Sequence, residues 1–389
     1  MDWTVWLEWF LKAAIMLLIL LTGFAYLTLY ERRALARIQT RIGPNRAGPQ
    51  GVLQPIADAV KLIFKEELTP AKADKVLFVL APILTVVPAM ILAAVIPFGT
   101  QFTLPFTNRV VTLHVADINV GVLYLTAIAS ISVYGIVLAG WASNNKYAML
   151  GGMRSTAQMI SYELALGMCF VVAILLGNSM DLIDIVNAQN TMWFAVLQPV
   201  GALIFMITTL AEVNRAPFDM PESEQELAAG YHSEYSGMKF ALFFMAEYEK
   251  MIVISLIAAT LYFGGYREFW FLSGTIFSVD AVWHLGPWTI TNWFLGPLYL
   301  LLKVIVLLFF MIWVRATWPR IRYDRLMAFG WKVLLPLSIA VVVLTALGVL
   351  LAQQYGGQYI WTIPALSIAA GLIMILALNI SLRRKVAHA

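Results

Sequence analysis

Apolar runs of about twenty residues dominate this chain, and short polar segments separate them. A hydrocarbon layer roughly 30 Å thick requires about twenty consecutive apolar residues in helical conformation. The pattern therefore predicts an all-α polytopic membrane protein in which residues 1–389 form a single integral membrane domain. We place nine transmembrane helices at approximately 10–31, 77–97, 119–140, 156–177, 193–214, 239–264, 297–316, 333–352 and 359–381.

The distribution of Lys and Arg predicts how these helices are oriented. Of the 26 basic residues, 21 fall in the loop 32–76, in every second loop after it and in the tail 382–389. The alternate loops hold only Arg109 and Arg267. The positive-inside rule places the N-terminus outside and the C-terminus in the cytoplasm. We interpret the first run as a retained helix, because acidic residues precede it and it lacks the cleavage site of a signal peptide.

Charge and composition argue against several classes of function. Topology accounts for the excess of basic residues and for the isoelectric point near 9.0, so no nucleic-acid partner is needed. The single cysteine, Cys169, lies inside a predicted span, and the four histidines are scattered without the spacing of metal ligands. We therefore expect this chain to bind no metal ion, flavin or iron–sulfur cluster.

One loop contains a predicted amphipathic helix at residues 53–67. Apolar residues recur there at helical spacing, whereas Asp58, Lys61 and Lys65 occupy another face. Such a helix lies at the membrane surface. Two interpretations remain open: the helix only anchors the loop, or its apolar face covers a lipid-side entrance for a hydrophobic ligand.

Acidic residues gather beside the membrane in the segment 212–240, within a chain that is only 12% charged. Glu163, Glu212 and Glu247 lie in the predicted spans, where a charge costs about 2.5–3.5 kcal/mol at a helix centre. Buried acids exchange protons near neutral pH, so these residues are candidates for a proton relay. The segment continues the series with Asp219, Glu222, Glu224, Glu226 and Glu234.

A structural alternative is local ion pairing. Glu212 could pair with Arg215, and Glu247 could pair with Lys250, because residues three apart are neighbours on a helix. This alternative does not serve Glu163, whose helical neighbours are polar but uncharged.

Four segments resemble a known family: "YERRALARIQTRIGPNRAGPQGVLQPIADAVKLIFKEE", "GWASNNKYAMLGGMRSTAQMISYELALG", "AEVNRAPFDMPESEQELAAGYHSEYSGMKFALFFMAEY" and "WVRATWPRIRYDRLMAFGWK". They are similar to the H subunits of bacterial NADH-quinone oxidoreductase, the counterparts of mitochondrial subunit 1 of respiratory complex I. The resemblance covers nearly the whole chain. A ninth span extends beyond the eight-helix core of many members.

The resemblance implies a function in proton-coupled electron transport. In that family the subunit is the heel of the membrane arm and frames the quinone cavity with the peripheral arm. Quinone, either ubiquinone or menaquinone, is then the substrate, while other subunits use NADH and hold the flavin and clusters. The chain alone has no complete active site. Implied partners are the peripheral-arm quinone-site and iron–sulfur subunits, small membrane subunits, antiporter-like subunits and lipid of the bacterial inner membrane.

The same resemblance assigns roles to individual residues. The carboxylates would lead from the quinone cavity through Glu163, Glu212 and Glu247 toward the antiporter-like subunits. Arg215, Arg315 and Arg320 would act as counter-charges. The residues expected near the quinone passage are Glu31, Arg32, Ala57, Asp58, Val60 and Lys61.

Some features depart from the family pattern or leave alternatives open. Ser130 stands in the third span where some members carry a carboxylate, and Glu249 and Lys250 receive no role. The main alternative is the homologous heel subunit of a membrane-bound hydrogenase-type complex. A stand-alone secondary transporter would show an internal repeat with interrupted helices, and we find none.

Overall fold

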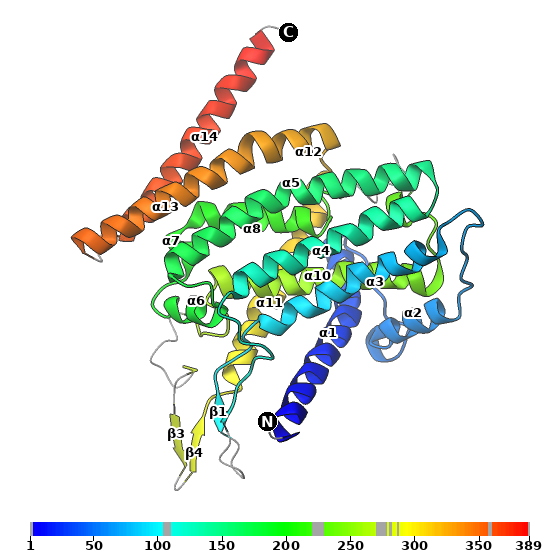
Figure 1. Ribbon diagram of the computed structural model, residues 1–389, viewed down its shortest axis with the longest axis horizontal. Coiled ribbons are helices and arrows are strands. Elements are labelled where there is room, and N and C mark those ends of the chain that lie inside the picture. Colours follow the sequence, from blue (N-terminus) through cyan, green and yellow to red (C-terminus); the bar gives the residue numbers. More distant parts are fainter. Residues whose placement is uncertain are drawn as a thin grey trace.

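A computed structural model describes residues 3–103, 110–219, 229–269, 278–279, 282–285, 288–356 and 360–387. The fold is almost entirely helical (Figure 1). Its long helices are α1 (Trp3–Ile38), α3 (Lys75–Leu92), α4 (Gly121–Ala142), α5 (Lys146–Gly177), α8 (Pro199–Glu212), α10 (Gly237–Tyr262), α11 (Leu295–Thr317), α13 (Leu335–Tyr355) and α14 (Thr362–Ala387).

Short elements connect these helices. Four are α-helices: α2 (Gln54–Ile63), α6 (Leu182–Ala188), α7 (Phe194–Leu197) and α12 (Tyr323–Phe329). Three are 3-10 turns, η1 (Pro49–Gly51), η2 (Ala93–Val95) and η3 (Gly230–His232), and a π-turn, η5 (Gly330–Leu334), joins α12 to α13. Two antiparallel hairpins pair β1 (Phe102–Thr103) with β2 (Val110–Val111), and β3 (Val282–Leu285) with β4 (Trp288–Thr291).

Eight of the nine predicted spans each overlap one long helix, and the span 193–214 is divided between α7 and α8. The described residues do not establish the number of helices that cross the membrane. Six helices are long and apolar enough to span a bilayer, and α8 and the apolar part of α14 are shorter. Helix α10 has sufficient length but carries Glu247, Glu249 and Lys250 at its centre. The count of nine spans and their orientation therefore stay predictions.

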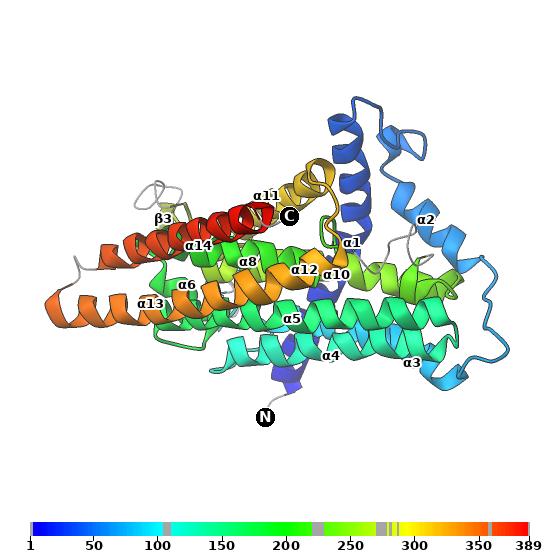
Figure 2. The same cartoon turned by 90° about the horizontal axis from the view of Figure 1, so that it is seen from above.

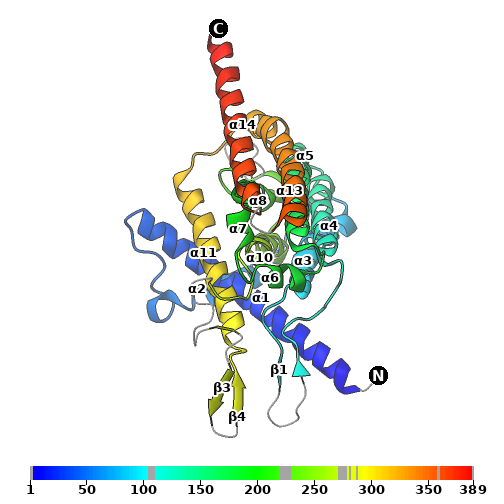
Figure 3. The ribbon, with the colours of Figure 1, turned by 90° about the vertical axis from the view of Figure 1, so that its left-hand side faces the viewer.

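The long helices form a layered bundle. Helices α3, α4, α5 and α13 lie side by side in one layer, and α8 and α10 pack behind them (Figures 1 and 2). Helix α1 crosses this bundle obliquely and contacts α10 and α11 (Figure 3). Helix α14 packs on α13 and α8 and then extends away from the bundle (Figure 1).

Small residues allow the closest approach within the layer. A Cβ atom added to Gly135 of α4 would lie 2.8 Å from the carbonyl oxygen of Ala81 on α3. One added to Gly140 would lie 2.7 Å from the carbonyl oxygen of Ala148 on α5. Because both obstacles are backbone atoms, a larger residue at either position would force the helices apart.

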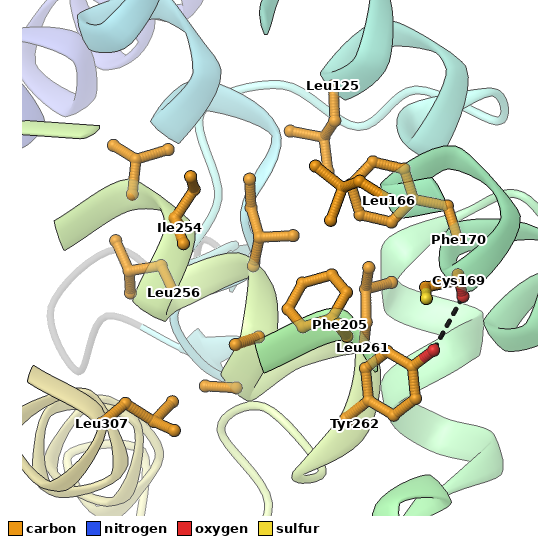
Figure 4. Packing of buried hydrophobic residues seen from close by; sticks show 14 of the residues in the cluster. Leu125, Leu166, Cys169, Phe170, Phe205, Ile254, Leu256, Leu261, Tyr262 and Leu307 are labelled. Carbon is orange, nitrogen blue, oxygen red and sulfur yellow. Dashed lines mark hydrogen bonds between the residues drawn. The ribbon is translucent and has the colours of Figure 1, made fainter. Parts of the chain in front are cut away.

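The main hydrophobic core lies where α4, α5, α8, α10 and α11 meet (Figure 4). Phe205 of α8 packs between Phe170 of α5 and Tyr262 of α10, with ring centroids 5.9 Å and 5.1 Å away. The hydroxyl of Tyr262 donates to the carbonyl oxygen of Cys169 over 2.8 Å. This core fixes the three helices that carry the predicted acids.

Connecting elements gather at the two ends of the bundle. Helices α2 and α12 lie at one end, and α6 and the hairpins lie toward the other (Figure 1). Asp74 caps α3 by accepting from the backbone amides of Val76 and Leu77, and Asn145 caps α5 by accepting from the amide of Tyr147. These caps explain why both helices begin where they do.

Candidate functional site

An ion-pair cluster lies at the end of the bundle that carries α2. Arg215, just after α8, is 6% exposed and contacts carboxylates from two other helices. Its Nη1 lies 3.1 Å from Oε1 of Glu31 on α1, and its Nε lies 2.5 Å from Oε1 of Glu247 on α10. Arg315 of α11 also pairs with Glu31, and the Arg215 guanidinium lies 4.5 Å from the ring centroid of Tyr248. We call these five residues the arginine cluster.

The cluster corrects the local pairing considered from the sequence. Arg215 does not pair with Glu212, three residues before it, because α8 ends at Glu212 and the chain turns at Asn214, where φ is 55°. The turn directs Arg215 toward α1 and α10. Glu247 likewise pairs with Arg215, and not with Lys250 on its own helix.

Gln158 of α5 holds this turn in place. Its side chain is fully buried, and its Nε2 lies 3.0 Å from the carbonyl oxygen of Ala211 and 2.7 Å from that of Phe218. The same nitrogen lies 3.1 Å from Oδ1 of Asn214. Gln158 is one of the polar, uncharged neighbours of Glu163 in the sequence, and we predicted no role for it. The sequence could have indicated this role, because an amide side chain buried in an apolar helix requires hydrogen-bond partners.

Glu163, Glu212 and Lys250 line a cavity of about 40 Å³, which we call the Glu163 cavity. Its other walls are mainly apolar and come from α3, α4, α5, α8 and α10, including several side chains labelled in Figure 4. Glu212 is 5% exposed, and its Oε2 has no hydrogen-bond partner among the described residues.

A second cavity of about 20 Å³ is also lined by Glu212 and Lys250. Glu247, Asn214 and Tyr231 also line it, and we call it the Glu247 cavity. One water molecule requires roughly 10–15 Å³ of such volume, so each cavity has room for water. Glu212 and Lys250 thus line both cavities, with Glu163 in the first and Glu247 in the second.

Ser130 of α4 donates a hydrogen bond to Oε1 of Glu163. The sequence left the contribution of the third predicted span in doubt, because a serine stands where some relatives carry a carboxylate. The contact shows that this helix supplies a hydroxyl to Glu163. A hydroxyl both donates and accepts a proton, although it does not ionise near neutral pH.

The remaining acids are distributed differently. Asp219 Oδ2 pairs with Arg320 over 2.8 Å, so this predicted counter-charge meets an acid of the 212–240 segment. Burial lowers the pKa of His232 to about 4, against the opposing charge of Asp219, and His232 is therefore neutral at pH 7. Glu234 lies apart from both cavities and accepts from Asn145 over 2.6 Å. Glu222, Glu224 and Glu226 fall outside the described residues.

The residues expected near a quinone passage separate into two groups. Arg32 Nη1 pairs with Asp58 Oδ2 on α2 over 2.7 Å, whereas Glu31 turns inward and is 2% exposed in the arginine cluster. Ala57, Val60 and Lys61 lie on exposed faces of α2. The predicted helix 53–67 is shorter than expected, since α2 ends at Ile63 before the charged residues 65–67.

Sequence reasoning assigned no role to Lys250 or to the neighbouring Glu249. Lys250 lines both cavities, while Glu249 is fully buried and neither carboxylate oxygen has a hydrogen-bond partner among the described residues. The sequence signal for these two residues was the occurrence of three charged residues within four positions of an apolar helix.

In the part of the chain that the structure describes, no group of His, Cys, Asp and Glu is arranged to hold a metal ion.

Comparison with known proteins identifies the family. The family model described as NADH dehydrogenase matches residues 11–346. The H subunit of NADH-quinone oxidoreductase from Thermomicrobium roseum is 47% identical over 357 residues, covering 89% of this chain and 97% of that protein. The first-numbered H subunit of the same enzyme from Geobacter metallireducens is 49% identical over 335 residues, covering 86% and 94%. The H subunit from Rhodospirillum centenum is 47% identical over 338 residues, covering 86% and 92%. The chain therefore belongs to the NADH dehydrogenase family, among the H subunits of NADH-quinone oxidoreductase.

Proposed function

We propose that this chain is the heel subunit of a proton-pumping NADH-quinone oxidoreductase of the bacterial inner membrane. In this role it frames the quinone cavity together with the peripheral arm and couples quinone reduction to proton translocation. The observation that carries the proposal is the pair of adjoining cavities, lined by Glu163, Glu212 and Glu247. The similarity to proteins named as H subunits of NADH-quinone oxidoreductase supports it.

The energetic cost of these acids favours a functional role. Carboxylates within membrane helices are expensive and generally mark ion or proton pathways. An ion pair satisfies Glu247, but Glu212 lies against two cavities without a direct ion pair to a described residue. Water in cavities of this size would connect carboxyl groups that do not touch, and a chain of such groups can carry protons.

The arginine cluster supplies a route from α2 to these cavities. Asp58 pairs with Arg32 on α1. Glu31, the residue before Arg32, turns inward and is joined through Arg215 to Glu247. A change of charge near Arg32 and Asp58 would therefore act on the pairing of Glu247 through adjacent ionised groups. We propose that quinone chemistry near α2 reaches the carboxylate relay by this route.

Quinone is the proposed substrate, and it would enter beside the exposed apolar face of α2. The chain supplies cavity walls and carboxylates, while partner subunits use NADH and transfer electrons. Asp219, Glu234 and the acids 222, 224 and 226 extend the proposed proton path toward the loop. Arg215, Arg315 and Arg320 are the proposed counter-charges. The first two pair with acids of the arginine cluster, and Arg320 pairs with Asp219.

Glu212 provides the sharpest test, because it lacks the arginine that confounds changes at Glu247. We expect Glu212→Gln to lower NADH:quinone turnover and proton uptake together by about tenfold or more, because an amide cannot exchange a carboxyl proton. Glu212→Asp keeps that proton and should be milder. Both are measured in intact complex reconstituted in vesicles.

A matched control is Glu268→Gln, which removes another buried carboxylate. Glu268 accepts from Ser278 over 2.8 Å and lies outside both cavities. We expect the Glu268→Gln variant to keep the wild-type NADH:quinone turnover per assembled complex. Wild-type turnover and proton uptake in Glu212→Gln would contradict the relay.

A further inference from the structure

Lys250 is one of two residues that the Glu163 cavity and the Glu247 cavity share in their lining. It lies on α10 and lines both the Glu163 cavity and the Glu247 cavity together with Glu212 of α8. The three carboxylates whose charges act on it come from three helices: Glu212 from α8, Glu163 from α5 and Glu247 from α10. No other described side chain lines both cavities except Glu212.

Structural lysines in membrane helices hold their ammonium group by direct bonds, and this chain contains an example. Lys303 of α11 donates to the carbonyl oxygens of Gly265 and Arg267 over 2.8 Å and 2.7 Å, and its Nζ lies 5.1 Å from the ring centroid of Trp193. Lys250 differs, because it makes no direct ion pair or hydrogen bond with another described residue. It shares the lining of two water-sized cavities with Glu163, Glu212 and Glu247.

We propose that Lys250 is a fourth proton-carrying group of the relay and transfers protons between the Glu247 cavity and the Glu163 cavity. This inference rests on the proposed function. An N–H bond of the ammonium breaks as an O–H bond forms on the Glu212 carboxylate, directly or through water. The neutral amine then takes a proton from protonated Glu247, so that one O–H bond breaks and the N–H bond re-forms.

The transfer is chemically reasonable for lysine at this position. A lysine surrounded by apolar groups readily loses its proton, whereas an arginine keeps its charge under all accessible conditions. Lys250 and Glu212 line the same two cavities, so the charge on either group acts on the other. A proton arriving at one group therefore changes the affinity of the other for a proton.

Lys250→Arg and Lys250→Met test the proposal in the intact complex. Both variants should lower proton uptake and NADH:quinone turnover by about tenfold, because neither side chain can release and regain a proton. NADH oxidation by a hydrophilic artificial acceptor should stay unchanged. Lys250→Arg keeps the cation, so its rate decides the question even where Lys250→Met fails to assemble.

A double variant separates a relay from an ion pair. If Lys250 only neutralises Glu212, Lys250→Met with Glu212→Gln should restore assembly and rate, since no buried charge is left unpaired. A relay predicts that the double variant stays impaired. Lys303→Met is the matched control, and we expect it to lower thermal stability without lowering turnover per assembled complex.

Two results would overturn the inference: wild-type proton uptake in Lys250→Arg, or recovery in the double variant. The first of these, combined with loss of uptake in Glu212→Gln, removes Lys250 from the relay and leaves the carboxylates in place. Wild-type uptake in both Lys250→Arg and Glu212→Gln removes the proposed relay as a whole.

Discussion

At the scale of single residues, the sequence identified the charged groups but not their partners. Local spacing suggested that Glu212 pairs with Arg215, because only neighbours along a helix can be read from sequence. The structure pairs Arg215 with Glu31, 184 positions away, and with Glu247. Such contacts depend on how α1, α8 and α10 pack. The role of each acid in proton transfer stays a prediction.

The arginine cluster leads to a prediction about stability. Arg215→Met leaves Glu31 and Glu247 with less compensating charge in a buried site, and removing one partner of a buried pair costs about 3–5 kcal/mol. We expect poorer assembly and a lower thermal inactivation temperature. Adding Glu247→Gln should recover part of this loss, with a coupling energy of about 0.5–3 kcal/mol.

The matched comparison is Arg215→Met combined with Glu212→Gln. Glu212 ends α8 just before this turn and forms no ion pair with Arg215, so its replacement should give no recovery of thermal stability. Recovery with Glu212→Gln and none with Glu247→Gln would show that the ion pair between Arg215 and Glu247 does not exist in the assembled protein.

At the scale of elements, hydrophobic periodicity predicted the positions of the helices well and their ends less well. Helix α5 begins at Lys146, ten residues before the expected span, because Asn145 caps it. The predicted span 193–214 divides into α7 and α8 at Gln198, whose side chain donates to Thr345 of α13 over 2.6 Å. A run of apolar residues does not reveal single polar residues that cap or interrupt a helix, so these helix ends could not be predicted.

The hydrophobic periodicity of α2 predicts its structure but not the molecule that its apolar face binds. Its apolar residues Ile56, Val60 and Ile63 are 57%, 46% and 57% exposed, so the rest of the described chain does not cover this face. The pattern predicted an amphipathic helix, and the structure contains one. Whether membrane lipid alone or also a quinone meets the apolar face depends on groups outside this chain.

The prediction for α2 is a selective loss of quinone reduction. Val60→Asp places a charge on the exposed apolar face, and Ala57→Trp fills the space beside it. If this face covers the quinone entrance, both changes should lower quinone reduction several-fold while NADH oxidation by a hydrophilic acceptor is unchanged. The control, Val120→Asp, alters an exposed valine just before α4 at the opposite end of the bundle. Equal loss of both activities would indicate failed assembly, and loss of neither would leave only membrane anchoring.

At the scale of the whole molecule, the sequence predicted an all-helical membrane protein, and the structure confirms that class. The long apolar runs were sufficient, because in a bilayer each helix must satisfy its own backbone hydrogen bonds. The oblique course of α1 and the position of α14 beyond α13 were not predictable. Both features depend on side-chain packing between helices, which produces no recognisable periodic pattern in the sequence. The single-domain boundaries also stay a prediction.

The last prediction concerns orientation, and it rests on the 21 basic residues that the predicted topology places on one side. The two ends of the bundle differ accordingly, with α2 and α12 at one end and α6 at the other (Figure 1). A fluorescent protein that matures only in the cytoplasm should fluoresce when fused after residue 389. Asn190→Cys places a thiol on an exposed residue just after α6, and a membrane-impermeant reagent should label it in intact cells. Cys169 is buried and serves as the internal control, since it should stay unlabelled. A dark fusion together with labelling of Asn190→Cys only after the cells are opened would reverse the orientation. It would also place the acids of the 212–240 segment on the outer side, where the proposed contact with a peripheral arm could not form.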